Sequence, residues 1–446
     1  MNNLAIVICN WNKKDDVLRC LDSVFSSIPS STQVIVVDNA STDGSVEALE
    51  AYDKHPFKLI KNNDNLGSSG GFNTGLKEAL SGKCKYVHLL DNDVVVNEDT
   101  FYNAYKLLEN DPDVGAVGSK LYQFDQPQKL QEMGAFVDWE ECQIKPQYAG
   151  VRDTPSIPDL VDSDYVPACS VMIRTELVRK IGLLDESFFL YWDDIEWFHR
   201  LRQTGYKVVC YGKSKAWHKM GVKIKKNTAG TYYFQRNRIR FFLKYSKENE
   251  VEKTVQTIFD DLFQSYYFSR LEAKFKTAKT VLCSITDALQ GIDGMAAEKR
   301  IKKCDPPLEK FKWWVKNQDK LVLDFDCSLS TRISVLGMIK NANPKADILI
   351  EDNSKAFRSP DLSKRKLPFK VCRVLDHVSN LSRVEMLDGF CYVDRFSNFI
   401  DSPEDRKQII NYKSRLIIAQ KKFYSKVLKN ALNFRKNQRR KFQDYE

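Results

Sequence analysis

The chain has 446 residues, which is too long for one compact core and predicts two or three domains. Hydrophobic residues make up 43% of it and charged residues 29%, as in ordinary globular proteins. Since no apolar run approaches the roughly 18 residues of a membrane-spanning helix, we expect none. Eleven cysteines without a Cys-x-x-Cys pair argue against zinc and a disulfide framework and predict a reducing cytoplasm. The first residues lack a basic region and a cleavage site, so we expect no secretion signal.

The net charge of +10 is concentrated near the carboxyl-terminal end. Residues 403–446 hold 13 Lys and Arg against 4 Asp and Glu, and apolar residues recur there at helical spacing. A basic amphipathic helix can lie on an anionic membrane surface, or it can pack on its own domain and expose the basic face. No recognised nucleic-acid-binding motif accompanies the charge, so we expect no nucleic-acid partner.

Predicted strands and helices alternate through the first 220 residues. The helices are expected at 17–25, after Ser41–Gly44 and at 67–80. The strands are expected at 4–9, 33–37, 58–61, 86–90, 114–119 and 166–173. This alternation predicts an α/β fold with a mostly parallel sheet that has helices on both faces. Irregular sequence over 126–158 predicts a long excursion from that sheet.

The pattern changes to long helical stretches from about residue 232 to residue 314. A smaller α/β unit follows, with strands at 321–326 and 346–351 and a helix at 333–340. Asp324 and Asp326 resemble a phosphate-binding turn, but the later acidic and lysine elements of a phosphohydrolase cannot be placed, so we expect a structural role. The predicted division is therefore 1–231, 232–314, 315–402 and 403–446.

The strand predicted at 86–90 ends in Asp91-Asn92-Asp93. Ligands of open α/β sheets bind where the strands end. Two carboxylates one residue apart suit Mg²⁺ or Mn²⁺, which could hold a nucleotide diphosphate. Taken alone, this tripeptide favours a turn or a helix cap. Three further segments favour the metal.

The first segment ends a strand in Asp38, whose carboxylate could accept the imide N–H of uracil or thymine. The second is the glycine-rich turn of residues 65–73, where the backbone can approach a ribose or pyrophosphate closely. In the third, Asp193 and Asp194 fall in the first turn of a predicted helix, where an ionised carboxylate is favoured and could take a proton from a sugar hydroxyl. Tyr191 and Trp192 offer flat surfaces for stacking on a sugar. Capping and core packing explain each segment singly, but not all the clusters together.

These motifs, together with Cys9-Asn10-Trp11-Asn12, occur in an order and spacing that resemble family 2 glycosyltransferases with the GT-A fold. The resemblance covers residues 4 to about 245 and implies a catalytic domain over 1–231 that binds a nucleotide sugar. Residues 192–196, 217–218 and 233–238 look most like those of galactofuranosyltransferases. Related rhamnosyltransferases more often carry Glu-Asp than Asp-Asp at the base, so the donor sugar stays open.

The resemblance implies a role for each matching residue. Asp91, Asp93 and His218 would hold Mn²⁺ or Mg²⁺, although His218 would otherwise be an ordinary histidine after a strand. Asp194 would be the catalytic base, and Asp193 would orient the acceptor. The residues implied in donor binding are Asn10, Asn12, Asp38, Asn39, Asn65, Gly70, Gly71, Asn73 and Asn92. His88, inside the metal-binding strand, is expected to pack or hydrogen-bond in the core.

The implied reaction is an inverting transfer from UDP-galactofuranose, with dTDP-rhamnose or another UDP-sugar as the other donors. The acceptor would be a hydroxyl of a growing glycan on a polyprenyl lipid at the cytoplasmic membrane face, with residues 403–446 as a peripheral anchor. A homo-oligomer is compatible with the sequence. A non-catalytic module that binds nucleotide sugar or polysaccharide is the main alternative, although binding alone needs no Asp-Asp pair. A nucleotidyltransferase would want a glycine-rich loop, which residues 9–14 lack.

Overall fold

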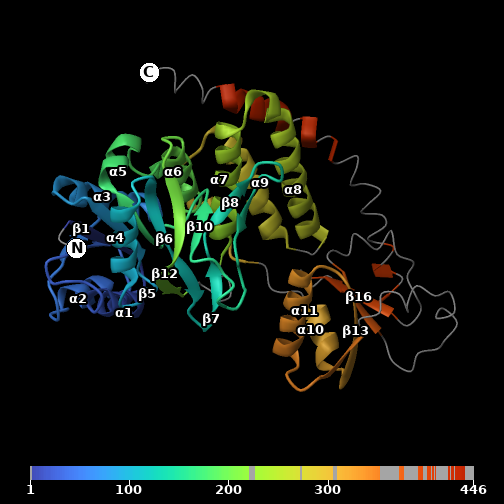
Figure 1. The fold of residues 1–446 in the computed structure, drawn as a ribbon. Coiled ribbons are helices and arrows are strands. Elements are labelled where there is room, and N and C mark those ends of the chain that lie inside the picture. Colours follow the sequence, from blue (N-terminus) through green and yellow to red (C-terminus); the bar gives the residue numbers. More distant parts are fainter. Residues whose placement is uncertain are drawn as a thin grey trace. The chain divides into compact units, whose positions relative to one another are not determined.

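The computed structural model describes residues 3–219, 227–271, 274–304, 309–351, 371–375, 390–394, 399–402, 404–405, 407, 420–421, 423–425 and 427–436. It separates into two compact units (Figure 1). The first comprises Met1–Leu262, Thr280–Lys303 and Leu428–Glu446, and the second comprises Phe263–Lys279 and Cys304–Val427. The four-part division expected from the sequence remains a prediction.

The first unit is built on a ten-stranded sheet with the order β10-β12-β6-β11-β4-β1-β2-β3. Two further strands lie off this path: β5 (Val94–Val96) pairs with β12, and β7 (Gln126–Glu132) pairs with β6. The strands along the main path are β1 (Leu4–Asn10), β2 (Gln33–Asp38), β3 (Lys58–Lys61), β4 (Tyr86–Asp91), β6 (Val114–Gln123), β10 (Leu160–Ser163), β11 (Ser170–Arg174) and β12 (Lys207–His218). Strands β3, β2, β1 and β4 run parallel, as do β6 and β12, whereas β11 lies antiparallel between β4 and β6. The predicted mostly parallel α/β sheet is confirmed.

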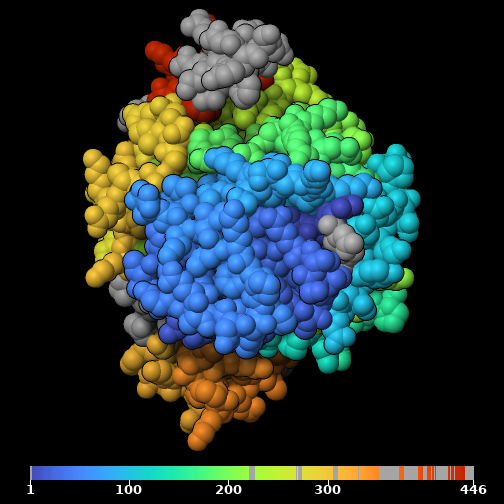
Figure 2. All heavy atoms as spheres, turned by 90° about the vertical axis from the view of Figure 1, so that its left-hand side faces the viewer, coloured from blue at the N-terminus to red at the C-terminus, as the bar shows by residue number. Residues whose placement is uncertain are grey.

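Helices cover both faces of this sheet (Figure 1). Ile6 and Ile8 of β1 belong to the hydrophobic core that contains residues of α1 and α4. Val7 points the other way, toward α3, where a Cβ on Gly75 would lie 2.2 Å from Val7 Cγ1. The helices of this region are α1 (Lys14–Phe25), α2 (Ser45–Glu50), α3 (Gly67–Ser81), α4 (Thr100–Asn110), α5 (Thr175–Ile181), η1 (Glu186–Phe188), α6 (Asp193–Arg202) and α7 (Ala229–Tyr245). Figure 2 shows the face that the amino-terminal residues, in blue, largely form.

The start predicted for one strand was wrong. The strand expected from residue 166 begins only at Ser170, because a turn in which Ser170 N donates to Pro167 O precedes β11. The helix expected after Ser41–Gly44 begins at Ser45, as predicted, since Gly44 takes a left-handed φ of 83° that ends the turn before it. The excursion at 126–158 contains β7 and a separate two-stranded sheet of β8 (Ala135–Asp138) and β9 (Gln143–Pro146).

Long helices follow the first sheet, as expected: α8 (Val251–Leu271) and α9 (Phe275–Gln290), with short η2 (Glu248–Glu250) and η3 (Glu298–Arg300). The second unit has a five-stranded sheet with the order β14-β13-β15-β16-β17. Buried Asp324 accepts a hydrogen bond from Arg373 Nε at 2.5 Å, which agrees with the expected structural role. The elements of this sheet and its helices are α10 (Glu309–Lys316), β13 (Lys320–Asp326), α11 (Leu329–Ala342), β14 (Asp347–Glu351), β15 (Val371–Leu375), β16 (Phe390–Asp394) and β17 (Phe399–Ile400).

The carboxyl-terminal basic segment lies partly outside the described residues, and Ile410 and Ile417 fall among those left out. In the described part, Ala431 and Phe434 are buried, and Arg435 donates to Ser246 O at 2.6 Å. This part therefore packs on the protein, as the second reading of the sequence allowed. Across the described ranges, no helix has both the length and the apolar character needed to cross a bilayer.

Candidate active site

Three side chains that suit a divalent cation meet where β4, β5 and β12 come together. Asp91 ends β4, Asp93 precedes β5, and His218 ends β12. Because β5 pairs with β12 so that Val94 lies opposite His218, this imidazole is brought beside Asp93. One ligand atom from each of Asp91, Asp93 and His218 lies within 4.8 Å of the other two. The structure thus brings together the three residues that were predicted to bind metal.

Two basic side chains contact Asp93 in this cluster. His218 Nε2 lies 3.3 Å from Asp93 Oδ1, and Lys13 Nζ donates to Asp93 Oδ2. Burial opposes ionisation of Asp93, but the contacts with His218 and Lys13 lower its pKa. Burial and the nearby Asp93 charge raise the pKa of Asp91 to about 6. A divalent cation would offset this crowding of carboxylates, so the donor set fits Mg²⁺ or Mn²⁺.

Gln131 fixes the orientation of the His218 ring. His218 Nδ1 donates to Gln131 Oε1 at 3.0 Å, so Nε2 faces Asp93 as an acceptor whenever the ring is neutral. This second hydrogen bond to a ligand histidine is the arrangement that orients metal-binding imidazoles. Neither Gln131 nor Lys13 was identified from the sequence, because nothing in the local pattern around them indicates a site.

The predicted nucleoside residues form a polar network beside the candidate metal ligands. Asn92 Nδ2 donates to Asn10 Oδ1 at 2.7 Å, and Asn10 Nδ2 donates to Asp38 Oδ2 at 2.8 Å. The other Asp38 oxygen accepts from Ser41 N at 2.8 Å. Asn12 is not part of this series of hydrogen bonds. Its Oδ1 accepts from Thr42 N, next to Ser41, at 2.7 Å. The network therefore ties the ends of β1, β2 and β4 into one rigid edge.

Asn39 holds the glycine-rich turn. Its Nδ2 donates to Asn65 Oδ1 at 3.1 Å and to Gly67 O at 2.9 Å, and its Oδ1 accepts from Leu66 N. Gly70 and Gly71 lie near the start of α3, and glycine is required there, because a Cβ on Gly71 would lie 2.3 Å from Cys9 Sγ. A Cβ on Gly70 would lie 2.5 Å from Leu66 Cβ.

Asn73 has a different role from the one expected. It is 1% exposed, and its Nδ2 donates to Leu184 O and Glu186 Oε1, both at 2.9 Å. Its Oδ1 accepts from Leu184 N at 3.0 Å. Since both amide hydrogens are used within the protein, the predicted donor contact of Asn73 is replaced by anchoring of the segment before α6.

Of the two carboxylates in the first turn of α6, Asp193 is buried beside the glycine-rich turn and Asp194 is half-buried. Asp193 accepts a hydrogen bond from Ser68 Oγ. Asp194 Oδ2 accepts from Ala168 N at 3.3 Å, and its Oδ1 accepts from Ile195 N at 2.8 Å. Burial and the Asp193 charge raise the pKa of Asp194 to about 8. Such a carboxyl is poised to exchange a proton near neutral pH.

The turn at 168–169 contacts both the Asp91–Asp93–His218 group and the carboxylate pair of α6. Cys169 O accepts from Asp91 N at 3.0 Å, while the preceding residue donates to Asp194. Burial raises the pKa of the Cys169 thiol, and the charges of Asp91, Glu132, Asp93 and Asp194 raise it further. The Cys169 thiol therefore lies close to Asp91 and Asp93 and also to Asp194, as expected if these carboxylates share a site.

Glu132 is a further acidic residue near this thiol. It is 8% exposed, and its Oε2 has no hydrogen-bond partner in the part of the chain that the structure describes. Burial raises its pKa to about 7. It was not identified from the sequence, because residues 126–158 were expected to be irregular, whereas Glu132 ends strand β7.

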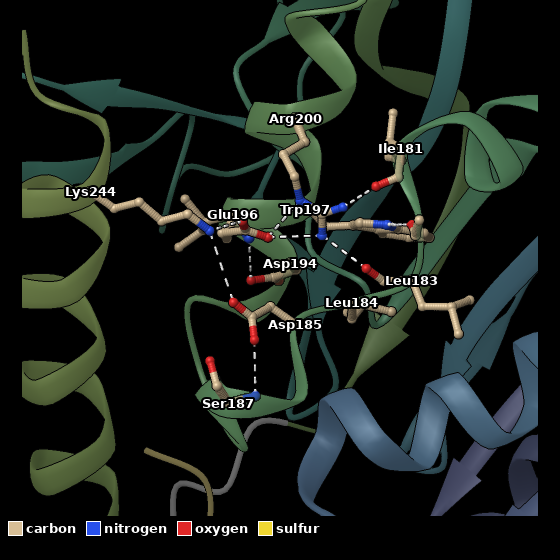
Figure 3. A network of polar contacts seen from close by, with 12 residues as sticks. Ile181, Leu183, Leu184, Asp185, Ser187, Asp194, Glu196, Trp197, Arg200 and Lys244 are labelled. Atoms are coloured by element: carbon tan, nitrogen blue, oxygen red, sulfur yellow. Dashed lines mark hydrogen bonds and ion pairs between the residues drawn. The ribbon is translucent and has the colours of Figure 1, made fainter. Parts of the chain in front are cut away.

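Polar contacts of Glu196, Trp197 and Arg200 hold helix α6 in place (Figure 3). Glu196, which is 0% exposed, forms ion pairs of 2.9 Å with Arg200 of the same helix and with Lys244 of α7. Burial disfavours its charge, but Lys244 and Arg200 lower its pKa. Arg200 Nη2 also donates to Leu183 O at 2.9 Å, and Trp197 Nε1 donates to Gly182 O at 2.9 Å. The position of Asp194 therefore depends on both α6 and α7.

The two predicted stacking aromatics lie differently. Tyr191 is 45% exposed, whereas Trp192 is 1% exposed and packs against Phe234, Phe241 and Phe242. The prediction that Trp192 stacks on a sugar was wrong, because its indole belongs to the core.

His88 is buried beside Phe101 and Ser170, as predicted.

Comparison with known proteins identifies a family domain in the amino-terminal part of the chain. The family model described as Glycosyl transferase family 2 matches residues 5–175. The low-salt glycan biosynthesis hexosyltransferase Agl10 of Haloferax volcanii is 24% identical over 213 residues, which are 47% of this chain and 64% of that protein. The galactofuranosyltransferase GlfT2 of Mycolicibacterium smegmatis is 25% identical over 239 residues, which are 48% of this chain and 37% of that protein.

A solved structure, that of GalNAc-T7 with UDP, GalNAc and Mn²⁺, matches with a TM-score of 0.46 and 16% identity. This match covers 59% of this chain and 50% of that one. The matched region thus spans less than two thirds of each relative. The family match covers the strands that carry the metal cluster's two aspartates, and residues 5–175 are a family 2 glycosyltransferase domain.

Proposed function

We propose that the protein transfers a sugar from a nucleotide diphosphate to an acceptor hydroxyl with inversion at the anomeric carbon. The observation that carries this proposal is the meeting of Asp91, Asp93 and His218 within 4.8 Å of one another, together with a second pair of carboxylates, buried Asp193 and half-buried Asp194. A cation site alone would serve binding. A separate carboxyl with a raised pKa, Asp194, supplies what a transfer needs in addition.

The donor would lie along the edge formed by the ends of β1, β2 and β4. Mn²⁺ or Mg²⁺ held by Asp91, Asp93 and His218 would neutralise charge on the departing diphosphate. Asn10, Asn12, Asp38, Asn39 and Asn92 shape the edge that receives the nucleoside. Asn65, Gly70 and Gly71 let the backbone of the turn approach the ribose or diphosphate. In this arrangement Gln131 keeps the imidazole of His218 correctly turned.

Asp194 would remove the proton from the acceptor hydroxyl. The hydroxyl oxygen then bonds to the anomeric carbon while the bond from that carbon to the diphosphate oxygen breaks, and its electron pair leaves with the nucleotide. Asp193, held by Ser68, would orient the acceptor, and exposed Tyr191 would stack on its ring. A single displacement of this kind inverts the anomeric centre.

UDP-galactofuranose is our favoured donor, with dTDP-rhamnose or another UDP-sugar next. The similarity to GlfT2, named as a galactofuranosyltransferase, supports this choice. We propose a glycan on a polyprenyl lipid as acceptor, reached by peripheral contact of residues 403–446 with the inner face of the membrane. Agl10, named for glycan biosynthesis, supports a glycan acceptor.

The test is a panel of UDP- and dTDP-sugars, each incubated with the enzyme and a lipid-linked acceptor, with and without Mn²⁺ or Mg²⁺. We expect acceptor- and metal-dependent release of nucleotide from one donor, and loss of metal dependence or of donor affinity in Asp93→Ala. Binding of nucleotide without release from any donor would favour a non-catalytic binding module instead. Activity in Asp93→Ala with unaltered metal dependence would contradict the ligand assignment.

A further inference from the structure

The segment that leads into α6 has an unusual backbone. Phe189, Tyr191 and Trp192 have φ values of 65°, 63° and 70°, in the left-handed region that side chains other than glycine rarely adopt. Three such residues within four positions store strain, and they persist only where the surrounding structure holds them. Because Asp193 and Asp194 follow at once, the conformation of this loop, residues 188–192, sets where α6 begins.

One side chain of α7 binds most of the loop's carbonyl groups. Asn237 is 0% exposed, and its Nδ2 donates to Phe188 O at 2.8 Å and to Leu190 O and Tyr191 O at 2.9 Å each. The two amide hydrogens of Asn237 are therefore shared among three carbonyl oxygens of the strained segment.

Arg236 completes this contact. It is also 0% exposed; its Nε donates to Asn237 Oδ1 at 3.0 Å and its Nη2 to Phe188 O at 3.0 Å. The first bond fixes the orientation of the Asn237 amide, so that its N–H groups face the loop. The ring of Phe189 stacks on Tyr233, one turn earlier on α7, with 5.0 Å between centroids.

The other side of the loop touches the glycine-rich turn. Ser68 N donates to Phe189 O at 2.7 Å, and a Cβ on Gly67 would lie 2.0 Å from that oxygen. Ser68 Oγ in turn donates to Asp193. The loop thus stands between the turn proposed to bind the donor and the helix that clamps it.

We infer that Asn237, oriented by Arg236, is a positioning residue that clamps the strained loop 188–192 and so fixes the carboxylates of Asp193 and Asp194 relative to the donor. This inference rests on the proposed function for its catalytic consequence. It assigns no contact between Asn237 and either substrate.

The test compares Asn237→Ala with Arg238→Ala. Arg238 is a matched control, because it lies on the same helix and is 4% exposed, but it donates to Cys142 O and Asp261 and not to the loop. We expect kcat to fall about 10²-fold in Asn237→Ala, as for a misplaced catalytic group, while the donor KM stays within about two-fold. Arg238→Ala should retain kcat within about two-fold of the wild type.

Hydrogen exchange over residues 187–194 gives a readout that does not depend on activity. Exchange should be faster in Asn237→Ala than in the wild type and unchanged in Arg238→Ala. If alanine prevents folding, the isosteric Asn237→Asp, which has no N–H donors, replaces it with the same expectations. Unchanged exchange, or equal kcat in the Asn237 and Arg238 variants, would overturn the inference. If the wild type released no nucleotide, the proposed function would fail, but the exchange comparison would still decide the clamp.

Discussion

His218 Nδ1 donates a hydrogen bond to Gln131 Oε1 at 3.0 Å, and the opposite ring nitrogen lies 3.3 Å from Asp93 Oδ1. The imidazole is thus held between a neutral acceptor and a carboxylate. Although burial favours the neutral ring, Asp93 raises the pKa of His218. The ring can therefore bind a proton or a metal at the same nitrogen, and its orientation is decided by Gln131.

Gln131→Ala should weaken metal activation without abolishing it. Loss of the hydrogen bond frees the ring to turn, and changes of this kind lower metal affinity by about 10- to 100-fold. The measurement is nucleotide release as a function of Mn²⁺ concentration. Gln128→Ala, on the same strand but exposed and paired with Arg152, is the control and should leave the curve unmoved. Identical curves for the two variants would contradict the role of Gln131.

Gly67→Ala should destabilise the protein more than Gly150→Ala. Both glycines have φ of +74°, so alanine carries the same left-handed cost of about 1–2 kcal/mol at each. A Cβ at Gly150 meets nothing within 4 Å, whereas at Gly67 it would lie 2.0 Å from Phe189 O. The difference in Tm between the two variants measures the cost of the clash at Gly67, because the backbone strain is the same in both. Equal losses of stability in the two variants would contradict the close approach of Gly67 to Phe189.

Asp194→Asn should make the protein more stable than the wild type, and this difference should grow as the pH rises. The folded-state pKa of about 8 lies above that of an unfolded carboxyl, so the folded protein keeps a proton that the unfolded chain loses. The wild type therefore loses stability between about pH 4 and pH 8, whereas the uncharged amide does not. The Tm of Asp194→Asn relative to wild type should increase across this window and level off above it. A constant difference from pH 4 to pH 9 would contradict the raised pKa of Asp194, and exposed Asp53→Asn provides the control.

The basic tail offers a test of membrane contact that spares the packed residues. Replacing Arg439, Arg440 and Lys441 with glutamine leaves Phe434 and Arg435 in place. If these cations face an anionic surface, each contributes about 1 kcal/mol, so vesicle affinity should fall roughly 100-fold. Flotation with anionic and neutral vesicles measures the effect. Equal flotation of both proteins with anionic vesicles would remove the proposed anchor from this segment.

Much of the fold followed from local patterns. Strand-forming residues that end in Asp38 and Asp91 predicted both the parallel sheet and the edge at which the acidic groups meet. His218, by contrast, needed the family resemblance, because its place beside Asp93 depends on the pairing of β5 with β12, about 120 residues apart in the chain. Long-range pairing of this kind leaves no trace in the sequence around either strand.

Burial was harder to predict than secondary structure. Tyr191 and Trp192 look alike in sequence, yet only Tyr191 is exposed, because the indole of Trp192 packs against aromatic rings of α7. Asn73 sits in a glycine-rich motif but is used to hold Leu184. Asn237 lies in a segment that the resemblance singled out, but its contacts with the loop before α6 required the tertiary structure.

The most direct test of the account is the comparison of wild-type protein with Asp194→Asn for both transfer and binding. We predict that kcat falls by at least about 10²-fold, while the affinity for the nucleotide with Mn²⁺ stays within about two-fold, because the donor residues are untouched. Retention of most of the activity by Asp194→Asn would contradict the claim that this carboxylate activates the acceptor beside the metal-bound donor.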